Sequence, residues 1–107
     1  MQLSPDPLFR ALADPTRRAL FERLCCEGEH SVGALTLGSG VSQPVVSKHL
    51  AVLKQAGLVI DRPSGRQTRY RADLAALAPL KNWTADMSTF WERRMDDLDD
   101  VLTRMDQ

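Results

Sequence analysis

Polar, small and basic side chains recur at helical spacing in the segment 41–58, which reads VSQPVVSKHLAVLKQAGL. Ser42 stands where its hydroxyl can cap a helix, and Pro44 fits a first helical turn, where its missing N–H does no harm. Gly57 stands where helices commonly end in a left-handed residue. The segment therefore predicts a helix over about 43–56 whose exposed side carries hydrogen-bonding groups.

The two sides of this predicted helix differ in chemistry. Val46, Leu50 and Leu53 recur at helical spacing and form an apolar side that can face a core. On the other side, small polar residues permit close approach to a DNA groove, where glutamine and serine hydrogen-bond base edges and lysine reaches guanine or phosphate. The candidate DNA contacts on this helix are Ser42, Gln43, Pro44, Ser47, Lys48 and His49. The alternative interpretation is an ordinary amphipathic surface helix.

A hairpin signal follows this helix directly. The sequence LVIDRPSGRQTRYRA contains two short runs of strand-forming residues around Ser64-Gly65. A hairpin placed after a DNA-reading helix is a wing, and the alternation along its second strand separates Tyr70, which we expect to pack inward, from the arginines. The candidate DNA contacts on the wing are Arg62, Arg66, Gln67 and Arg69.

Charge is distributed unevenly along the 107 residues, although the formal net charge is zero. Six basic residues and one acidic residue give the segment 41–72 a net charge of +5, whereas four basic and seven acidic residues give 74–107 a net charge of −3. The basic segment suits phosphate binding with an affinity that falls as salt rises. The acidic segment disfavours docking on DNA in the wrong orientation.

Length and composition indicate one domain, residues 1–107, and exclude several classes of protein. There is no basic-then-apolar leader and no apolar run long enough for a bilayer, so we expect a cytoplasmic protein without a membrane partner. Ser47, Lys48 and His49 cannot form a catalytic triad, because neighbouring side chains on a helix point about 100° apart. We therefore expect no enzymatic activity.

Further helices are predicted on both sides of the DNA-reading segment. The first covers about 6–12, the second starts after Asp14 and continues to about residue 26, and the third starts after Ser31 and ends near residue 37. Asp73 is expected to cap another helical region, which Pro79 breaks or kinks so that the last helix effectively starts near Leu80.

The last helix carries more apolar surface than one small domain covers. Its large apolar residues recur at three- and four-residue steps over about seven turns. We therefore expect a two-fold dimer through the terminal helices, with an interface of Leu8, Phe9, Leu80, Trp83, Met87, Phe90, Trp91, Leu98 and Leu102. Such a dimer would place two DNA-reading helices at half-sites about 34 Å apart, which predicts a palindromic operator in double-stranded DNA. The alternative is that the helix folds back over its own domain.

The motifs ADPTRRALFERL, SQPVVSKHLAVLKQAGLV and GRQTRYRAD resemble those of the ArsR/SmtB family of bacterial repressors, and the resemblance covers nearly the whole chain. It implies a mainly α-helical winged helix-turn-helix fold with a small β-hairpin, in the order α-α-α-α-β-β-α, that forms a homodimer. It also implies a regulator that sits on its operator and blocks transcription. By motif match, the DNA-reading positions are Ser42, Gln43, Pro44, Ser47 and Lys48, supported by His49 and the wing arginines.

The residues with which this family senses metals are mostly absent here. Its metal sensors often hold cysteines in the third helix, where this chain reads SVGALTLGS, and His30 and His49 lack the spacing of a metal pair. We therefore expect no metal and no cofactor, and the sequence identifies no inducer. The adjacent thiols of Cys25 and Cys26 leave one alternative open, a repressor that senses arsenite or oxidants, although Cys25 is also placed to pack. A winged helix that only docks proteins is the other alternative.

Overall fold

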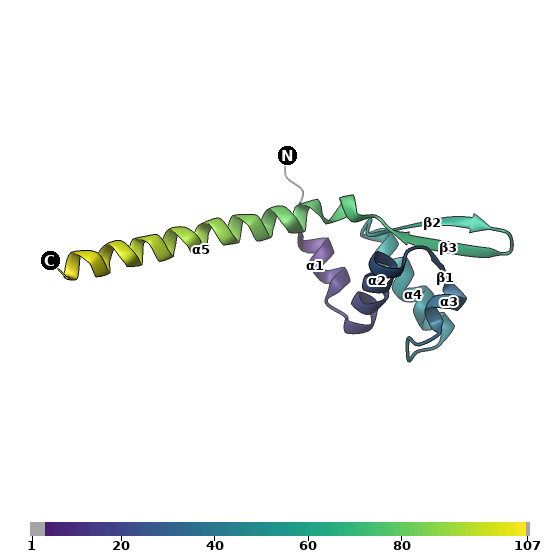
Figure 1. The fold of residues 1–107 in the computed structure, drawn as a ribbon. Coiled ribbons are helices and arrows are strands. Elements are labelled where there is room, and N and C mark those ends of the chain that lie inside the picture. The colour runs from purple at the N-terminus through teal and green to yellow at the C-terminus, as the bar shows by residue number, and fades with distance from the viewer. Residues whose placement is uncertain (1–3, 107) are drawn as a thin grey trace.

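The computed structural model describes residues 4–106, in which five α-helices and three short strands follow one another as in Figure 1. The predicted order of four helices, a hairpin and a final helix is confirmed, and the helical region expected after Asp73 is a 3₁₀ turn; β1 is an addition. The elements are α1 (Asp6–Leu12), α2 (Pro15–Glu27), β1 (His30–Ser31), α3 (Val32–Thr36), α4 (Gln43–Gln55), β2 (Val59–Ser64), β3 (Gln67–Ala72), the 3₁₀ turn η1 (Leu74–Leu77) and α5 (Ala78–Met105).

Two of the predicted helix caps are present as hydrogen bonds. The Asp14 carboxylate accepts from the Arg17 backbone N–H at 2.9 Å, and the Ser31 hydroxyl accepts from the Ala34 N–H at 3.1 Å. Both bonds satisfy N–H groups that a helix start otherwise leaves without a partner. They place the starts of α2 and α3 at the positions that the sequence indicates.

The expected side-chain caps of Ser42 and Asp73 are wrong. Ser42 has the extended backbone of an N-cap, but its hydroxyl makes no capping hydrogen bond to α4. Pro44 occupies the second helical position, where it has no N–H to offer, so one of the two usual donors to a capping side chain is missing. Asp73 likewise precedes η1 without a capping side-chain bond.

The core lies between α1, α2, α3, α4 and the start of β2. Its buried members are Leu8, Ala11, Leu20, Phe21, Leu24, Leu35, Val46, Leu50, Leu53, Leu58 and Val59. Leu8 is only 4% exposed and belongs to this core, so its predicted place in a dimer interface is wrong. Leu8 and Ala11 lie three residues apart, so both face inward, whereas Phe9, the residue after Leu8, is 40% exposed.

Two arginines of α2 fasten the end of α1. Arg17 donates from Nε to the carbonyl oxygen of Ala11 and from Nη2 to that of Arg10, and Arg18 donates from Nη1 to that of Leu12. Carbonyls in the last turn of a helix have no helical N–H, so guanidinium groups supply their hydrogen bonds. These contacts fix α1 against the start of α2.

The sheet is antiparallel with strand order β1-β3-β2. Ser64 pairs with Gln67, which leaves Gly65 and Arg66 as the two residues of the hairpin turn. Gly65 has a φ of +64° at the first of these positions, where a type II′ turn requires a positive φ. His30 and Ser31 pair with Tyr70 and Arg69, so β1 joins the wing to the segment before α3.

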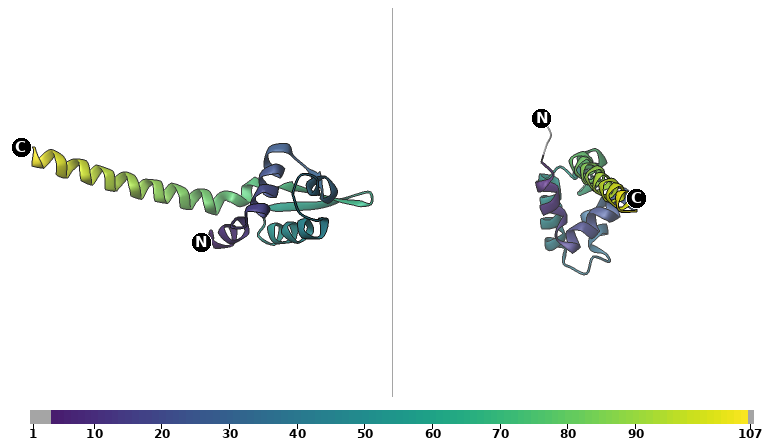
Figure 2. Two further views of the ribbon diagram at one scale, coloured as in Figure 1. Left: turned by 90° about the horizontal axis from the view of Figure 1, so that it is seen from below. Right: turned by 90° about the vertical axis from the view of Figure 1, so that its left-hand side faces the viewer.

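Helix α5 begins at Ala78, two residues before the predicted start, because Pro79 lies in its first turn and neither breaks nor kinks it. Its 28 residues extend about 42 Å away from the other helices as a single rod (Figure 2). Near its start Trp83 meets Phe9 of α1 edge to face, with ring centroids 5.1 Å apart. Among residues 4–106, no helix is both long and apolar enough to cross a membrane.

Candidate nucleic-acid interface

The first half of α4 separates an exposed polar side from a buried apolar side. Val46 and Leu50 are fully buried, whereas five of the predicted DNA contacts are exposed: Ser42, Gln43, Pro44, Ser47 and Lys48. Because the Ser42 hydroxyl makes no capping bond in α4, it is available to an external partner. Gly57, with a φ of +81°, ends the helical segment as the sequence predicts.

The start of α4 and the tip of the wing line one concave surface. Its volume is about 430 Å³, and it is lined by Ser31, Val32, Gly33, Gln43, Ser47, Arg66, Gln67 and Thr68. The structure thereby brings together four of the predicted contacts, two from the helix and two from the wing. Ser31, Val32, Gly33 and Thr68 also line this surface and are not among the predicted contacts. The sequence signals near this place are the cap motif at Ser31 and the predicted wing strand that contains Thr68.

Two of the six basic residues in 41–72 are held by carboxylates. Arg62 Nη2 lies 2.7 Å from Glu29 Oε1, and Lys54 Nζ donates to Asp61 Oδ2 at 3.0 Å. The hydrogen bond from Lys54 to Asp61, together with their opposite charges, raises the pKa of Lys54. The Lys54–Asp61 pair is already balanced within the net charge of +5, whereas Glu29 lies outside 41–72 and offsets one further charge, that of Arg62.

The remaining four cations of that segment lie on α4 and the wing and carry its free positive charge. Within residues 4–106, no carboxylate oxygen lies within 4.0 Å of the charged nitrogens of Lys48, Arg66, Arg69 or Arg71. Lys48 is exposed on α4, Arg66 is exposed at the wing tip, and Arg69 is half-buried on β3. Tyr70, between Arg69 and Arg71, packs against the core as predicted. The charge available to phosphates is thus smaller than the net +5 suggests.

His49 occupies a different place from the other predicted contacts on α4. Its side chain is 16% exposed, with Nε2 4.0 Å from Asp14 Oδ1 and Nδ1 3.5 Å from Arg17 Nη1. The backbone N–H of Arg17, with help from the nearby His49, lowers the pKa of Asp14. His49 therefore joins α4 to the start of α2 and does not share the exposed side of Ser47 and Lys48.

The two thiols lie exposed near the end of α2. Burial raises the pKa of Cys25, and the neighbouring Cys26 and Glu22 raise it further. A raised pKa lowers the fraction of reactive thiolate. Among the residues that the structure describes, no group of three or more His, Cys, Asp or Glu side chains could hold a metal ion. These positions give no support to a thiol sensor.

Comparison with known proteins agrees with this geometry. Residues 12–62 match the model of a helix-turn-helix domain family. The chain is 48% identical over 92 residues to the HTH-type transcriptional regulator Rv2034 of Mycobacterium tuberculosis, an alignment that covers 86% of this chain and 82% of that protein.

Solved structures show the same fold. An ArsR-like transcriptional regulator from Rhodococcus sp. RHA1 superposes with a TM-score of 0.75 at 30% identity, over 90% of each chain. A homodimeric winged helix-turn-helix DNA-binding domain from Mycobacterium bovis superposes with a TM-score of 0.62 at 32% identity, over 76% of this chain and 77% of that one. With its exposed α4, its basic wing and these relatives, the chain belongs to the ArsR family of winged helix-turn-helix transcriptional regulators.

Proposed function

We propose that this protein is a homodimeric repressor that binds a palindromic operator in double-stranded DNA. Its one winged helix-turn-helix domain places α4 in the major groove and the wing along the adjacent backbone, with α1 and α5 as dimerisation helices. A dimer bound across an operator blocks access of the transcription machinery to the same DNA. Such a protein would act in the cytoplasm and carry no enzymatic activity.

The observation that carries this proposal is the surface shared by α4 and the wing. Gln43 and Ser47 can reach base edges from the helix, while Arg66 and Gln67 line the other side of the same hollow. The free cations Lys48, Arg69 and Arg71 add contacts to phosphate that position the helix without reading sequence. Direct readout and backbone contact would therefore come from α4 and the wing together.

The dimer rests on the apolar side chains that α5 leaves uncovered. Trp83, Met87, Phe90, Trp91, Leu98 and Leu102 are between 43% and 65% exposed. Met95, Val101 and Met105 extend the same stripe. An exposed apolar stripe that runs along a whole helix favours association with another protein surface. In a two-fold dimer, each copy uses this stripe to cover the same stripe of its partner. Phe9, in contact with Trp83, brings α1 into this interface.

Genomic footprinting of the purified protein at graded salt tests the proposal, because one experiment reports the site, its symmetry and the spacing of its halves. We expect inverted half-sites with centres about 34 Å apart, or one turn of DNA. Protection should weaken steeply as salt rises. Binding that is insensitive to salt, or a protected site without two-fold symmetry, would overturn it.

A further inference from the structure

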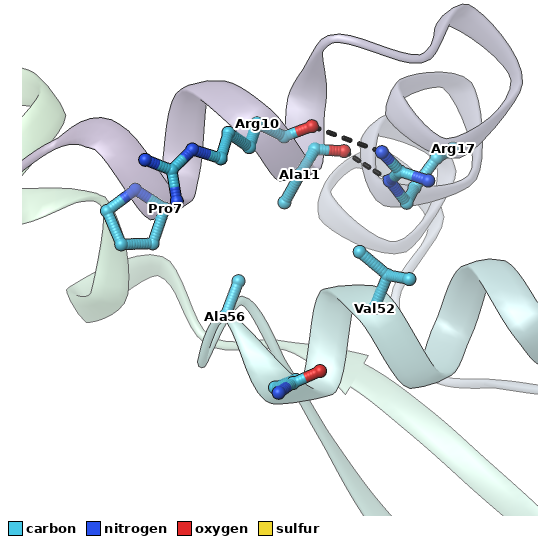
Figure 3. Close-up of a pocket in the computed structure, with 7 residues that line it drawn as sticks. Pro7, Arg10, Ala11, Arg17, Val52 and Ala56 are labelled. Carbon is cyan, nitrogen blue, oxygen red and sulfur yellow. Dashed lines mark hydrogen bonds between the residues drawn. The ribbon is translucent and has the colours of Figure 1, made fainter.

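A hollow outside the DNA-binding face opens where α1, the start of α2 and the end of α4 meet (Figure 3). Its volume is about 480 Å³, within the range of small-molecule sites in proteins. The lining residues are Pro7, Arg10, Ala11, Arg17, Val52, Gln55 and Ala56. It shares no residue with the concave surface between α4 and the wing.

The lining combines two positive charges with apolar walls. Figure 3 shows the guanidinium of Arg10 beside Pro7 and that of Arg17 at the other end of the hollow, with Val52 and Ala56 on the facing helix. Gln55 supplies one amide. This is the composition of an organic-ligand site, in which apolar walls bind the body of the ligand and a few polar groups fix its orientation.

Neither guanidinium forms an ion pair with a carboxylate in the described part of the chain, although Asp14 lies near enough to Arg17 for their charges to interact. Within residues 4–106, no carboxylate oxygen lies within 4.0 Å of the guanidinium nitrogens of Arg10 or Arg17. Arg17 bonds instead to the uncharged carbonyls of Ala11 and Arg10, which hold its guanidinium in place. A fixed cation beside an apolar wall attracts an anion, and guanidinium groups bind carboxylates with matched geometry.

We propose that this hollow binds a small organic carboxylate with a short hydrocarbon body. The carboxylate accepts hydrogen bonds from the guanidinium of Arg10, the charge of Arg17 adds to the attraction, and the hydrocarbon packs against Val52, Ala56 and Pro7. Such a ligand would contact α1, which carries the dimer residue Phe9, and α4, which carries the DNA contacts, at the same time. The site goes beyond the DNA-binding function and does not depend on it.

Hexanoate and adipate are suitable probes, since they present one and two carboxylates on a short chain. Each is titrated into the full-length protein at constant ionic strength and without DNA, and the backbone amide signals of Ala11, Val52 and Ala56 are followed by NMR. We expect saturable shifts at these residues in the millimolar range with at least one probe. Hexanol, which has the same chain without the charge, should not reproduce them.

Two variants and one control test whether the carboxylate of the probe binds at Arg10 beside Val52. Arg10→Gln and Val52→Asp should each weaken probe binding at least tenfold, since the first removes a cation and the second adds a repelling carboxylate. Both positions are exposed, so the fold should tolerate the changes. Arg104→Gln removes an arginine from the far end of α5 and should leave binding unchanged.

Three results would overturn the proposal. They are the absence of saturable shifts with both probes, equal shifts with hexanol, and equal weakening by Arg10→Gln and Arg104→Gln. Because the titration contains no DNA, each of these results leaves the DNA-binding function untouched. Loss of operator binding in footprinting would, in turn, say nothing against the hollow.

Discussion

Arg62 on β2 lies 2.7 Å from Glu29, which precedes β1, so the wing is tied to the segment that leads into α3. Across the hairpin, Arg62 is paired with Arg69, another arginine. Like charges directly opposite each other destabilise a strand pair, and Glu29 offsets that repulsion. The same carboxylate also removes Arg62 from the charge that is free to meet phosphate.

This pairing predicts how DNA binding responds to Glu29→Gln, which keeps the side-chain shape and removes its charge. The freed Arg62 should raise affinity for random DNA and steepen the plot of log binding constant against log salt by about 0.9 for each phosphate gained. Fluorescence anisotropy at several salt concentrations measures both quantities. Glu22→Gln, an exposed acid on α2 paired with Arg18 at 3.9 Å, is the matched control. Equal slopes for the two variants would contradict the prediction.

Gln43 is predicted to read a base from the first turn of α4. Gln43→Ala should relax preference at one operator position and cost about 1 to 3 kcal/mol on the proper site, because a lost bidentate contact affects only the matching base. Competition binding with operator variants measures this loss. Gln55→Ala, at the other end of the helix, should leave base preference unchanged. If Gln43→Ala weakens binding to all DNA sequences equally, Gln43 contacts the DNA backbone and not a base.

Arg69 is predicted to contact phosphate from β3. Arg69→Ala should weaken specific and random DNA alike and flatten the salt dependence by about one unit per phosphate lost. Titration of both DNAs across a salt series measures the two slopes. A loss confined to the operator would mean that Arg69 reads sequence.

Leu98 is half exposed on α5 and lies in the apolar stripe that we assign to the dimer. Leu98→Asp would bury a charge in that interface, so it should shift the protein toward monomer and reduce operator affinity. Analytical ultracentrifugation at several concentrations reports the change. Asp96→Asn, about half a helical turn away around the same helix, should remain dimeric. An unchanged dimer in Leu98→Asp would place the interface elsewhere.

Asp14 should contribute a pH-dependent part of the folding stability. The Arg17 N–H and the nearby His49 lower its pKa below the ordinary 3.8, so its charged form is favoured in the folded state. That contribution is present above the unfolded pKa and disappears as pH falls through the folded pKa. Asn retains a capping oxygen but does not titrate. Urea unfolding should therefore show the difference between wild type and Asp14→Asn shrinking below about pH 4, and parallel pH profiles would refute this.

The elements and their order were predictable because their signals are local. Asp14 and Ser31 cap the helices that they precede, and Gly57 and Gly65 take the positive φ values that their turns require. The apolar spacing of Val46, Leu50 and Leu53 identified the buried side of α4 before any partner was known. The sequence by itself thus determined which segments form the helices and the wing strands, and which side of α4 is exposed.

Tertiary packing decided which partner each side chain meets. Local spacing marks Leu8 and Phe9 equally as apolar, but only the docking of α1 buries Leu8 and leaves Phe9 beside Trp83. His49 lies against Asp14 and Arg17, and Arg62 lies against Glu29, because the fold brings together residues 32 or more positions apart. Two residues suffice for β1 only because β3 is already in place to pair with them. Such contacts depend on how several elements pack at once, and no periodicity within one segment encodes that packing.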